Sequence, residues 1–188
     1  MILIRFYLLL FCALFFFSYS DAMAYEEANY QIIKKNDIYE IRKYSNRLAI
    51  ETIESNQDSG FRKLFNYISG NNKTNQEIKM TTPVTRVEKN DNMTMQFYLP
   101  SNFDEKNVPD PSDENVNIVT VEGGYYAAII YSGRTTDKNF LKYTNILEKE
   151  LIKNNISITS FPIRATYNSP FTLPMNRRNE SMFKINFE

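Results

Sequence analysis

Apolar side chains recur at two different spacings along this chain, and the two spacings predict strands and helices. Short segments in which apolar or β-branched residues alternate or cluster between Asn-rich breaks are typical of strands. The expected strands cover residues 30–34, 38–44, 48–53, 81–88, 93–99, 116–121, 125–131, 163–167 and 182–187. Helical spacing appears instead at residues 58–69 and 137–154. Gly123-Gly124 predicts a hairpin turn between the strands that flank it.

The first helical segment carries one apolar stripe, and a polar loop and an extended segment follow it. The stripe consists of residues three or four positions apart: Phe61, Leu64, Phe65 and Ile68. Pro83 excludes a helical conformation for the residue before it, so the segment around Pro83 is extended. This succession points to a ligand-binding fold rather than to a catalytic motif.

The order of the expected elements repeats along the chain. Residues 29–100 and 115–188 each contain a strand pair, a helix and a second strand pair. The segment 101–115 is polar and contains two prolines, so we expect a surface connection between the repeats. The pattern predicts a pseudo-twofold α+β domain in which antiparallel strands curve into a barrel-like sheet flanked by the two helices.

Residues 1–24 have the features of a secretory signal peptide. Arg5 gives a short basic start, the apolar run 6–17 is too short to span a bilayer comfortably, and Ala22-Met23-Ala24 fits a cleavage site. An uncleaved anchor is the alternative. We expect cleavage after Ala24, export to the periplasm or the extracellular space, and no stable membrane span in the mature chain. Residues 25–188 then suffice for a single domain, which we expect to be monomeric.

The composition excludes several classes of function. The chain has 22 Lys and Arg against 22 Asp and Glu, so no basic excess argues for binding to nucleic acid. It has no histidine, and its one cysteine, Cys12, lies in the expected signal peptide. The mature chain therefore lacks the ligands and nucleophiles for disulfides, structural zinc, histidine-ligated haem and Ser-His-Asp triads. We expect neither zinc nor a nucleotide as a cofactor.

Several short motifs follow one another along nearly all of residues 25–188. They are Tyr39-Glu40-Ile41-Arg42 with Tyr44, Phe61-x-x-Leu64-x-x-Tyr67-Ile68-x-Gly70-Asn71, Ile78-x-Met80-Thr81-x-Pro83-Val84, Tyr131-Ser132-Gly133, Tyr167-Asn168-Ser169-Pro170 and Arg177-Arg178-Asn179-Glu180. Together they resemble the SOUL haem-binding family. The resemblance implies an α+β fold: a distorted antiparallel β-barrel of about eight strands flanked by two helices and built as a tandem β-α-β-β repeat. Similar domains bind small molecules in bacterial effector-sensing regulators.

The resemblance also implies that haem or another tetrapyrrole binds in a hydrophobic groove between the first helix and a loop near the C-terminus. On the helix, the corresponding positions are Phe61, Leu64, Phe65 and Ile68. Across the groove, they are Phe171, Leu173 and Met175. The alternative for the helix is that its stripe packs on the sheet, and the alternative for the loop is that it folds back onto the core.

The charged and metal-binding parts of such a site depart from the family pattern. Basic positions of characterised relatives fall here on Asp58, Asn66 and Leu173. Pairing with propionates would have to come from other basic residues: Arg62, Lys63, Lys79, Arg177 or Arg178. Without histidine, the axial candidates are Met80, Met175, Tyr67 and Tyr167. Binding without an axial protein ligand suits this composition better. The alternatives for Arg177 and Arg178 are that they are solvated or that they bridge to Glu180.

We therefore predict a secreted or periplasmic, non-enzymatic haem- or tetrapyrrole-binding protein that acts as a carrier or scavenger. One alternative is a hydrolase or isomerase, or an effector-binding module, that uses the same groove for a small molecule. An enzyme of this kind would use a Glu or Tyr as acid or base, and Glu40, Glu51 and Glu77 lie in or near expected strands. The other alternative is that the apolar loop 170–175 docks a protein partner.

Overall fold

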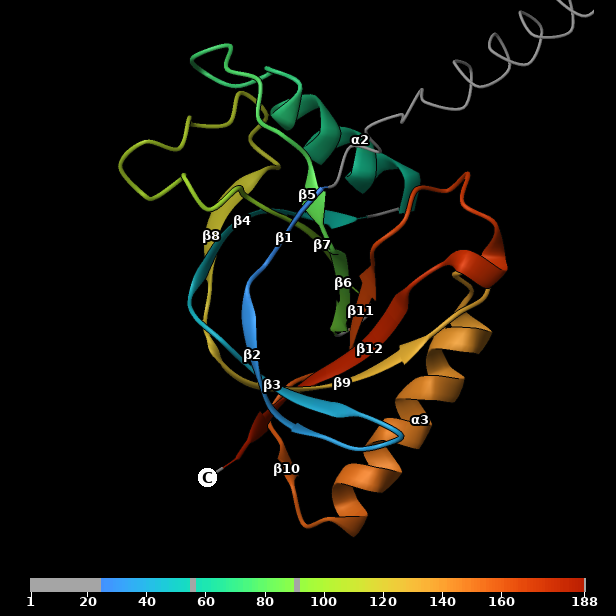
Figure 1. Cartoon of the computed structure of the whole chain (residues 1–188). Coiled ribbons are helices and arrows are strands. Elements are labelled where there is room, and N and C mark those ends of the chain that lie inside the picture. Colours follow the sequence, from blue (N-terminus) through green and yellow to red (C-terminus); the bar gives the residue numbers. More distant parts are fainter. Residues whose placement is uncertain (1–24, 55–56, 90–91, 188) are drawn as a thin grey trace, which may run out of the picture.

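The computed structural model describes residues 25–54, 57–89 and 92–187 as a curled antiparallel half-barrel with two helices on its outside (Figure 1). The predicted signal peptide, residues 1–24, lies outside the described residues. The helices are α2 (Gln57–Ile68) and α3 (Asp137–Lys153), with a short 3-10 helix η1 (Pro174–Asn176). The strands are β1 (Glu26–Glu27), β2 (Tyr30–Lys35), β3 (Glu40–Tyr44), β4 (Arg47–Glu54), β5 (Thr81–Thr82), β6 (Val84–Lys89), β7 (Asn92–Tyr98), β8 (Asn117–Val121), β9 (Gly124–Tyr131), β10 (Ser157–Ile158), β11 (Ile163–Thr166) and β12 (Asn179–Asn186).

The strand order of the large sheet shows the predicted pseudo-twofold repeat. The order is β2-β3-β9-β12-β11-β6-β7-β4-β8, with β10 beside β12. Each strand of the first repeat has a counterpart in the second: β3 and β8, β4 and β9, β6 and β11, and β7 and β12. Replacing every strand from β3 to β8 in this order by its counterpart gives the same order read backwards. Helix α2 packs on β4 and β7, and α3 packs on the equivalent β9 and β12. The predicted α+β fold is thus confirmed, and β2 and β10 add to its symmetric strands.

The predicted hairpin at Gly123-Gly124 is wrong. Strand β8 pairs with β4, whereas β9 pairs with β3 and β12. Tyr44 faces Gly124 in the pairing of β3 with β9, and Arg47 faces Val121 in the pairing of β4 with β8. The register is the same before and after the bend, so the segment β3–β4 pairs with the segment β8–β9 as one bent antiparallel ladder. A Cβ on Gly123 would lie 2.5 Å from the carbonyl oxygen of Tyr44, and Gly124 has a φ of +122°. The two glycines therefore permit a close backbone approach at a bend of the sheet.

A buried network of charges crosses the sheet from β3 to β12. Arg42 is 0% exposed and donates to Glu40 from Nε at 2.9 Å, and to the two carboxylate oxygens of Glu180 from Nη1 and Nη2 at 2.7 and 3.1 Å. Glu180, also 0% exposed, accepts further hydrogen bonds from Arg178 at 2.9 Å and from the Tyr167 hydroxyl at 3.0 Å. Two arginines and two carboxylates therefore balance one another, with Arg42 and Glu180 fully buried and Arg178 partly exposed.

The network also holds the N-terminal end of the described chain. Arg178 donates from Nη1 to the two carboxylate oxygens of Glu27 at 3.1 and 3.0 Å. Glu27 belongs to β1, which pairs in parallel with β5 and crosses one end of the half-barrel (Figure 1). Within the described ranges, no helix has the length and apolar character needed to cross a membrane.

We expect Glu180→Gln to lower the free energy of unfolding by about 3–5 kcal/mol, because it leaves the fully buried Arg42 and the partly exposed Arg178 with reduced compensation. Glu148→Gln is the matched control, since Glu148 is exposed on α3, and it should change stability by less than about 0.5 kcal/mol. Urea unfolding at neutral pH measures both. Equal stability of the two variants would contradict the role assigned to the network.

The stability contributed by Glu40 should depend on pH. Burial raises the pKa of Glu40, but hydrogen bonds and charge from Lys35 and Arg42 outweigh burial and hold the pKa below its usual 4.5. This contribution is complete above the pKa of the unfolded chain and is lost as the pH falls through the lower folded pKa. We expect the difference in unfolding free energy between the wild type and Glu40→Gln to be constant near neutral pH and to shrink below about pH 4. Urea unfolding across pH 3–7 tests this, and a difference independent of pH would refute it.

Candidate functional site

A groove of about 390 Å³ lies between α2, the extended segment 80–86 and the loop that joins β11 to β12. Figure 1 shows this loop, in red, beside α2. The walls come from segments far apart in the chain, because the pseudo-twofold arrangement places β11 next to β6 at the centre of the sheet. Tyr25, at the start of the described chain, also contacts the groove.

The apolar stripe of α2 is divided between the core and the groove. Leu64 is 0% exposed and Ile68 is 6% exposed, and both pack in a cluster with β4 and β7. Phe61 and Phe65 are instead 41% and 47% exposed and line the groove. Their rings stack nearly parallel, with centroids 6.0 Å apart and planes inclined by 12°. This half of the stripe presents a flat aromatic surface to solvent, one helical turn long.

The opposite loop contributes its two ends to the groove, while its apolar side chains point elsewhere. Pro170 and Arg177 line the groove. The side chains of Phe171, Leu173 and Met175 are 95%, 61% and 74% exposed and lie outside the lining of the groove. The predicted loop thus borders this groove, but its three apolar side chains do not form the walls, contrary to the expectation from the sequence.

Arg177 holds this loop in shape. Its Nε donates to the carbonyl oxygen of Thr172 at 2.8 Å, and Nη2 donates to the carbonyl oxygen of Pro170. Nη1 donates to the hydroxyl of Thr135 at 3.1 Å, which ties the loop to the segment before α3. One guanidinium thus fixes both ends of the loop against a neighbouring part of the chain.

Five basic residues are predicted from the sequence to pair with propionates. Among the described residues that line the groove, Arg177 is the only one of these five. Arg62 and Lys79 are exposed and Lys63 is half-buried, and all three lie outside the lining. Arg178 is committed to Glu180 and Glu27 in the buried network. Its guanidinium also lies 3.7 Å above the ring centre of Tyr167.

The axial candidates also differ in position. The buried Tyr67 donates from its hydroxyl to the carbonyl oxygen of Pro109 at 2.7 Å and does not face the groove. Tyr167 lines the groove, but burial and the negative charge of Glu180 raise the pKa of its hydroxyl, which stays protonated. Met80 is half-buried, lines the groove and packs against the core under α2.

Arg86 is a groove residue that the sequence reasoning missed. Its Nε lies 3.9 Å from a carboxylate oxygen of Glu54, and its side chain reaches the groove from β6. Met80, Thr82 and Val84 line the groove as well, so every second residue from 80 to 86 points the same way. Alternation along the predicted strand is visible in the sequence, so counting every second residue from Met80 would have identified Arg86 as a groove residue.

Comparisons with known proteins agree with the fold and the motifs. A family model described as SOUL heme-binding protein matches residues 25–184. The Mus musculus protein named heme-binding protein 2 is 32% identical over 164 residues, which cover 76% of this chain and 75% of the mouse protein. A hydrolase from Listeria innocua has a TM-score of 0.59 at 9% identity and covers 82% of this chain and 94% of its own. The EcmrR C-terminal domain has a TM-score of 0.58 at 14% identity and covers 84% of this chain and 98% of its own. At these identities the two solved structures show a shared fold alone.

The division of the α2 stripe predicts unequal costs for two similar truncations. Leu64→Ala should lower the free energy of unfolding by about 2–5 kcal/mol, because it opens a cavity in the core. Phe65→Ala should cost about 1 kcal/mol, since it removes a half-exposed ring and its contact with Phe61. Chemical denaturation of both variants provides the comparison. A loss for Phe65→Ala as large as that for Leu64→Ala would place Phe65 in the core.

Proposed function

The chain belongs to the SOUL heme-binding protein family, and on this premise we propose that it binds haem or another tetrapyrrole in the groove between α2 and the loop 167–177. The stacked pair Phe61 and Phe65 carries this proposal. Two large rings that remain almost half exposed beside a fully buried Leu64 are apolar surface that a flat ligand would cover. Covering apolar surface stabilises a complex by about 25 cal/mol per Å², so a ring as large as a porphyrin binds largely through contact area.

The polar wall of the groove suits the carboxylate side groups of a tetrapyrrole. Arg177 makes three hydrogen bonds, one from each guanidinium nitrogen, and a guanidinium has five N–H donors. It is therefore held in place and still has donors for a ligand carboxylate. Arg86 adds a second positive charge on the wall formed by β6. When bound, haem would supply its own iron chemistry, and Met80 is the axial candidate on the wall of the groove.

The walls of the groove support a binding protein rather than an enzyme. Among the described residues that line it, none is an Asp or Glu that could act as acid or base. The pKa of Glu40 is lowered by its partners rather than raised, and Glu51 accepts a hydrogen bond from Gln96 at 2.9 Å. We infer a non-enzymatic carrier or scavenger. A hydrolase would have to use a groove tyrosine, Tyr25 or Tyr167, and burial and the charge of Glu180 raise the pKa of Tyr167, which disfavours it as a base.

We further propose that the protein is exported and that the mature chain begins at Tyr25. The basic, apolar and small-residue regions of residues 1–24 support this. The family match begins at residue 25, at the same boundary as the expected cleavage site. The N-terminal sequence of the protein recovered from a secreting host tests the proposal, and an intact Met1 on the recovered protein would contradict it.

Titration of the purified protein with haemin should shift the Soret band to saturation at one equivalent. Phe65→Glu should weaken binding at least about tenfold, a loss of about 1.4 kcal/mol, because it places a charge where the ring must lie. Leu173→Glu should weaken binding less, since Leu173 is not among the residues that line the groove. Ile152→Glu is the matched control, because Ile152 is an exposed apolar residue of α3 at 65% exposure and should bind as the wild type does. Circular dichroism shows whether each variant is folded, and a titration without saturation by folded protein would refute the proposal.

A further inference from the structure

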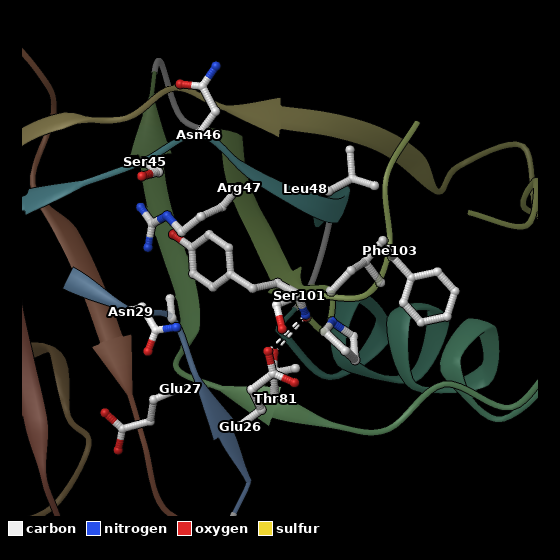
Figure 2. Close-up of a pocket in the computed structure, with 14 residues that line it drawn as sticks. Glu26, Glu27, Asn29, Ser45, Asn46, Arg47, Leu48, Thr81, Ser101 and Phe103 are labelled. Atoms are coloured by element: carbon white, nitrogen blue, oxygen red, sulfur yellow. Dashed lines mark hydrogen bonds between the residues drawn. The ribbon is translucent and has the colours of Figure 1, made fainter. Parts of the chain in front are cut away.

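A second cavity of about 300 Å³ lies at the bend of the sheet, and it shares no lining residue with the tetrapyrrole groove. Its walls come from the N-terminal segment 26–29, the β3–β4 corner 45–48 and the segment 98–103 after β7. Figure 2 shows Ser45, Asn46 and Arg47 along one side of this cavity and Glu26, Glu27 and Asn29 along the other. The cavity thus lies where the N-terminal segment faces the corner between β3 and β4.

Arg47 stands in a cage of tyrosines on the wall of the cavity. Its guanidinium carbon lies 4.2 Å from the ring centre of Tyr44, 4.4 Å from that of Tyr98 and 5.8 Å from that of Tyr126. Stacking on aromatic rings uses the faces of the planar guanidinium, whereas its N–H groups point outward in the plane. The cage therefore fixes the orientation of Arg47. The Tyr126 hydroxyl interacts with the guanidinium, and the remaining N–H groups are left for another partner.

The positive charge of Arg47 has no carboxylate partner within the described part of the chain. Arg42, Arg164 and Arg178 each form an ion pair there, and Arg47 forms none. The Nε of Arg47 is buried and has no hydrogen-bond partner. A buried N–H without an acceptor is unusual in folded proteins, and here it marks a guanidinium whose hydrogen bonds the described residues do not complete.

The two carboxylates that line the cavity lie on the side opposite Arg47, and neither forms an ion pair with it (Figure 2). Glu27 is paired with Arg178, and Glu26 accepts the backbone N–H of Ser101 at 2.8 Å. Asn46 accepts the backbone N–H of Gly123 through Oδ1 at 2.9 Å, so its side-chain NH2 group remains as a donor. The side of the cavity around Arg47 therefore presents one fixed positive charge together with an amide donor.

We propose that this cavity binds the oxyanion group of a small molecule, a carboxylate or a phosphate, with Arg47 as the anchoring residue. The guanidinium edge accepts a planar carboxylate or two phosphate oxygens in a two-point contact. The tyrosine cage holds that edge rigid, which lowers the entropic cost of binding. This site is separate from the tetrapyrrole groove, so it would give the protein a second ligand.

The test uses the full chain labelled with ¹⁵N and follows the Nε–H resonance of Arg47, which is assigned by its loss in Arg47→Gln. Sodium benzoate and inorganic phosphate are the two oxyanion probes, and benzamide is the neutral analogue of benzoate. We expect at least one oxyanion to shift this resonance to saturation while benzamide does not, and the two probes show whether carboxylate or phosphate is preferred. Absence of saturation with both oxyanions, or an equal response to benzamide, would overturn the proposal.

Two variants keep the test independent of folding and of the haem site. Asn29→Glu places a carboxylate on an exposed lining residue, where it should compete for Arg47 and weaken oxyanion binding at least tenfold. Arg134→Gln removes an exposed arginine outside the cavity and should leave oxyanion binding unchanged. Haemin titration of Asn29→Glu should match the wild type, so failure at one site is distinguishable from failure at the other. Unchanged oxyanion binding by Asn29→Glu would contradict the assignment.

Discussion

Arg42 and Glu180 are 138 residues apart in the chain, and both side chains are fully buried. Each buried charge is stable only because the opposite charge lies beside it. Their pairing brings β3 and β12 onto β9, which lies between them in the sheet. The same carboxylate binds Tyr167, on the wall of the groove, and Arg178, which holds Glu27 in the N-terminal segment. The curvature of the sheet, one wall of the groove and the position of the N-terminal segment thus depend on one buried carboxylate.

The N-terminal segment lies between the two candidate sites and contacts both. Tyr25 lines the tetrapyrrole groove, and residues 26–29 line the cavity at the bend. Strand β1 is only two residues long, so its position rests on side-chain contacts such as the pair of Glu27 with Arg178 as much as on its pairing with β5. The charges in the core therefore shape two surfaces that are otherwise formed by different parts of the chain.

A chain without histidine can still bind a tetrapyrrole because contact area and metal coordination are separate sources of affinity. The exposed rings of Phe61 and Phe65 provide area, and Arg177 provides donors at a fixed position. The cavity at the bend differs in how its arginine is held, because aromatic faces surround Arg47 whereas hydrogen bonds to the loop hold Arg177.

The sequence by itself determined the order of strands and helices, the repeat and the family, because these depend on local periodicity and on motifs within short segments. It also placed Leu64 and Phe65 on one stripe, but only the tertiary structure decided that Leu64 enters the core while Phe65 faces the groove. Periodicity shows which face of a helix is apolar, whereas the extent of the sheet beneath that face decides how much of it is covered. Gly123-Gly124 has the local signature of a hairpin, yet the strands around it pair with partners distant in the chain. Likewise, the sequence does not show that Arg47 and Arg178 have different surroundings. These arise from residues distant in the chain, which are tyrosines around Arg47 and carboxylates around Arg178.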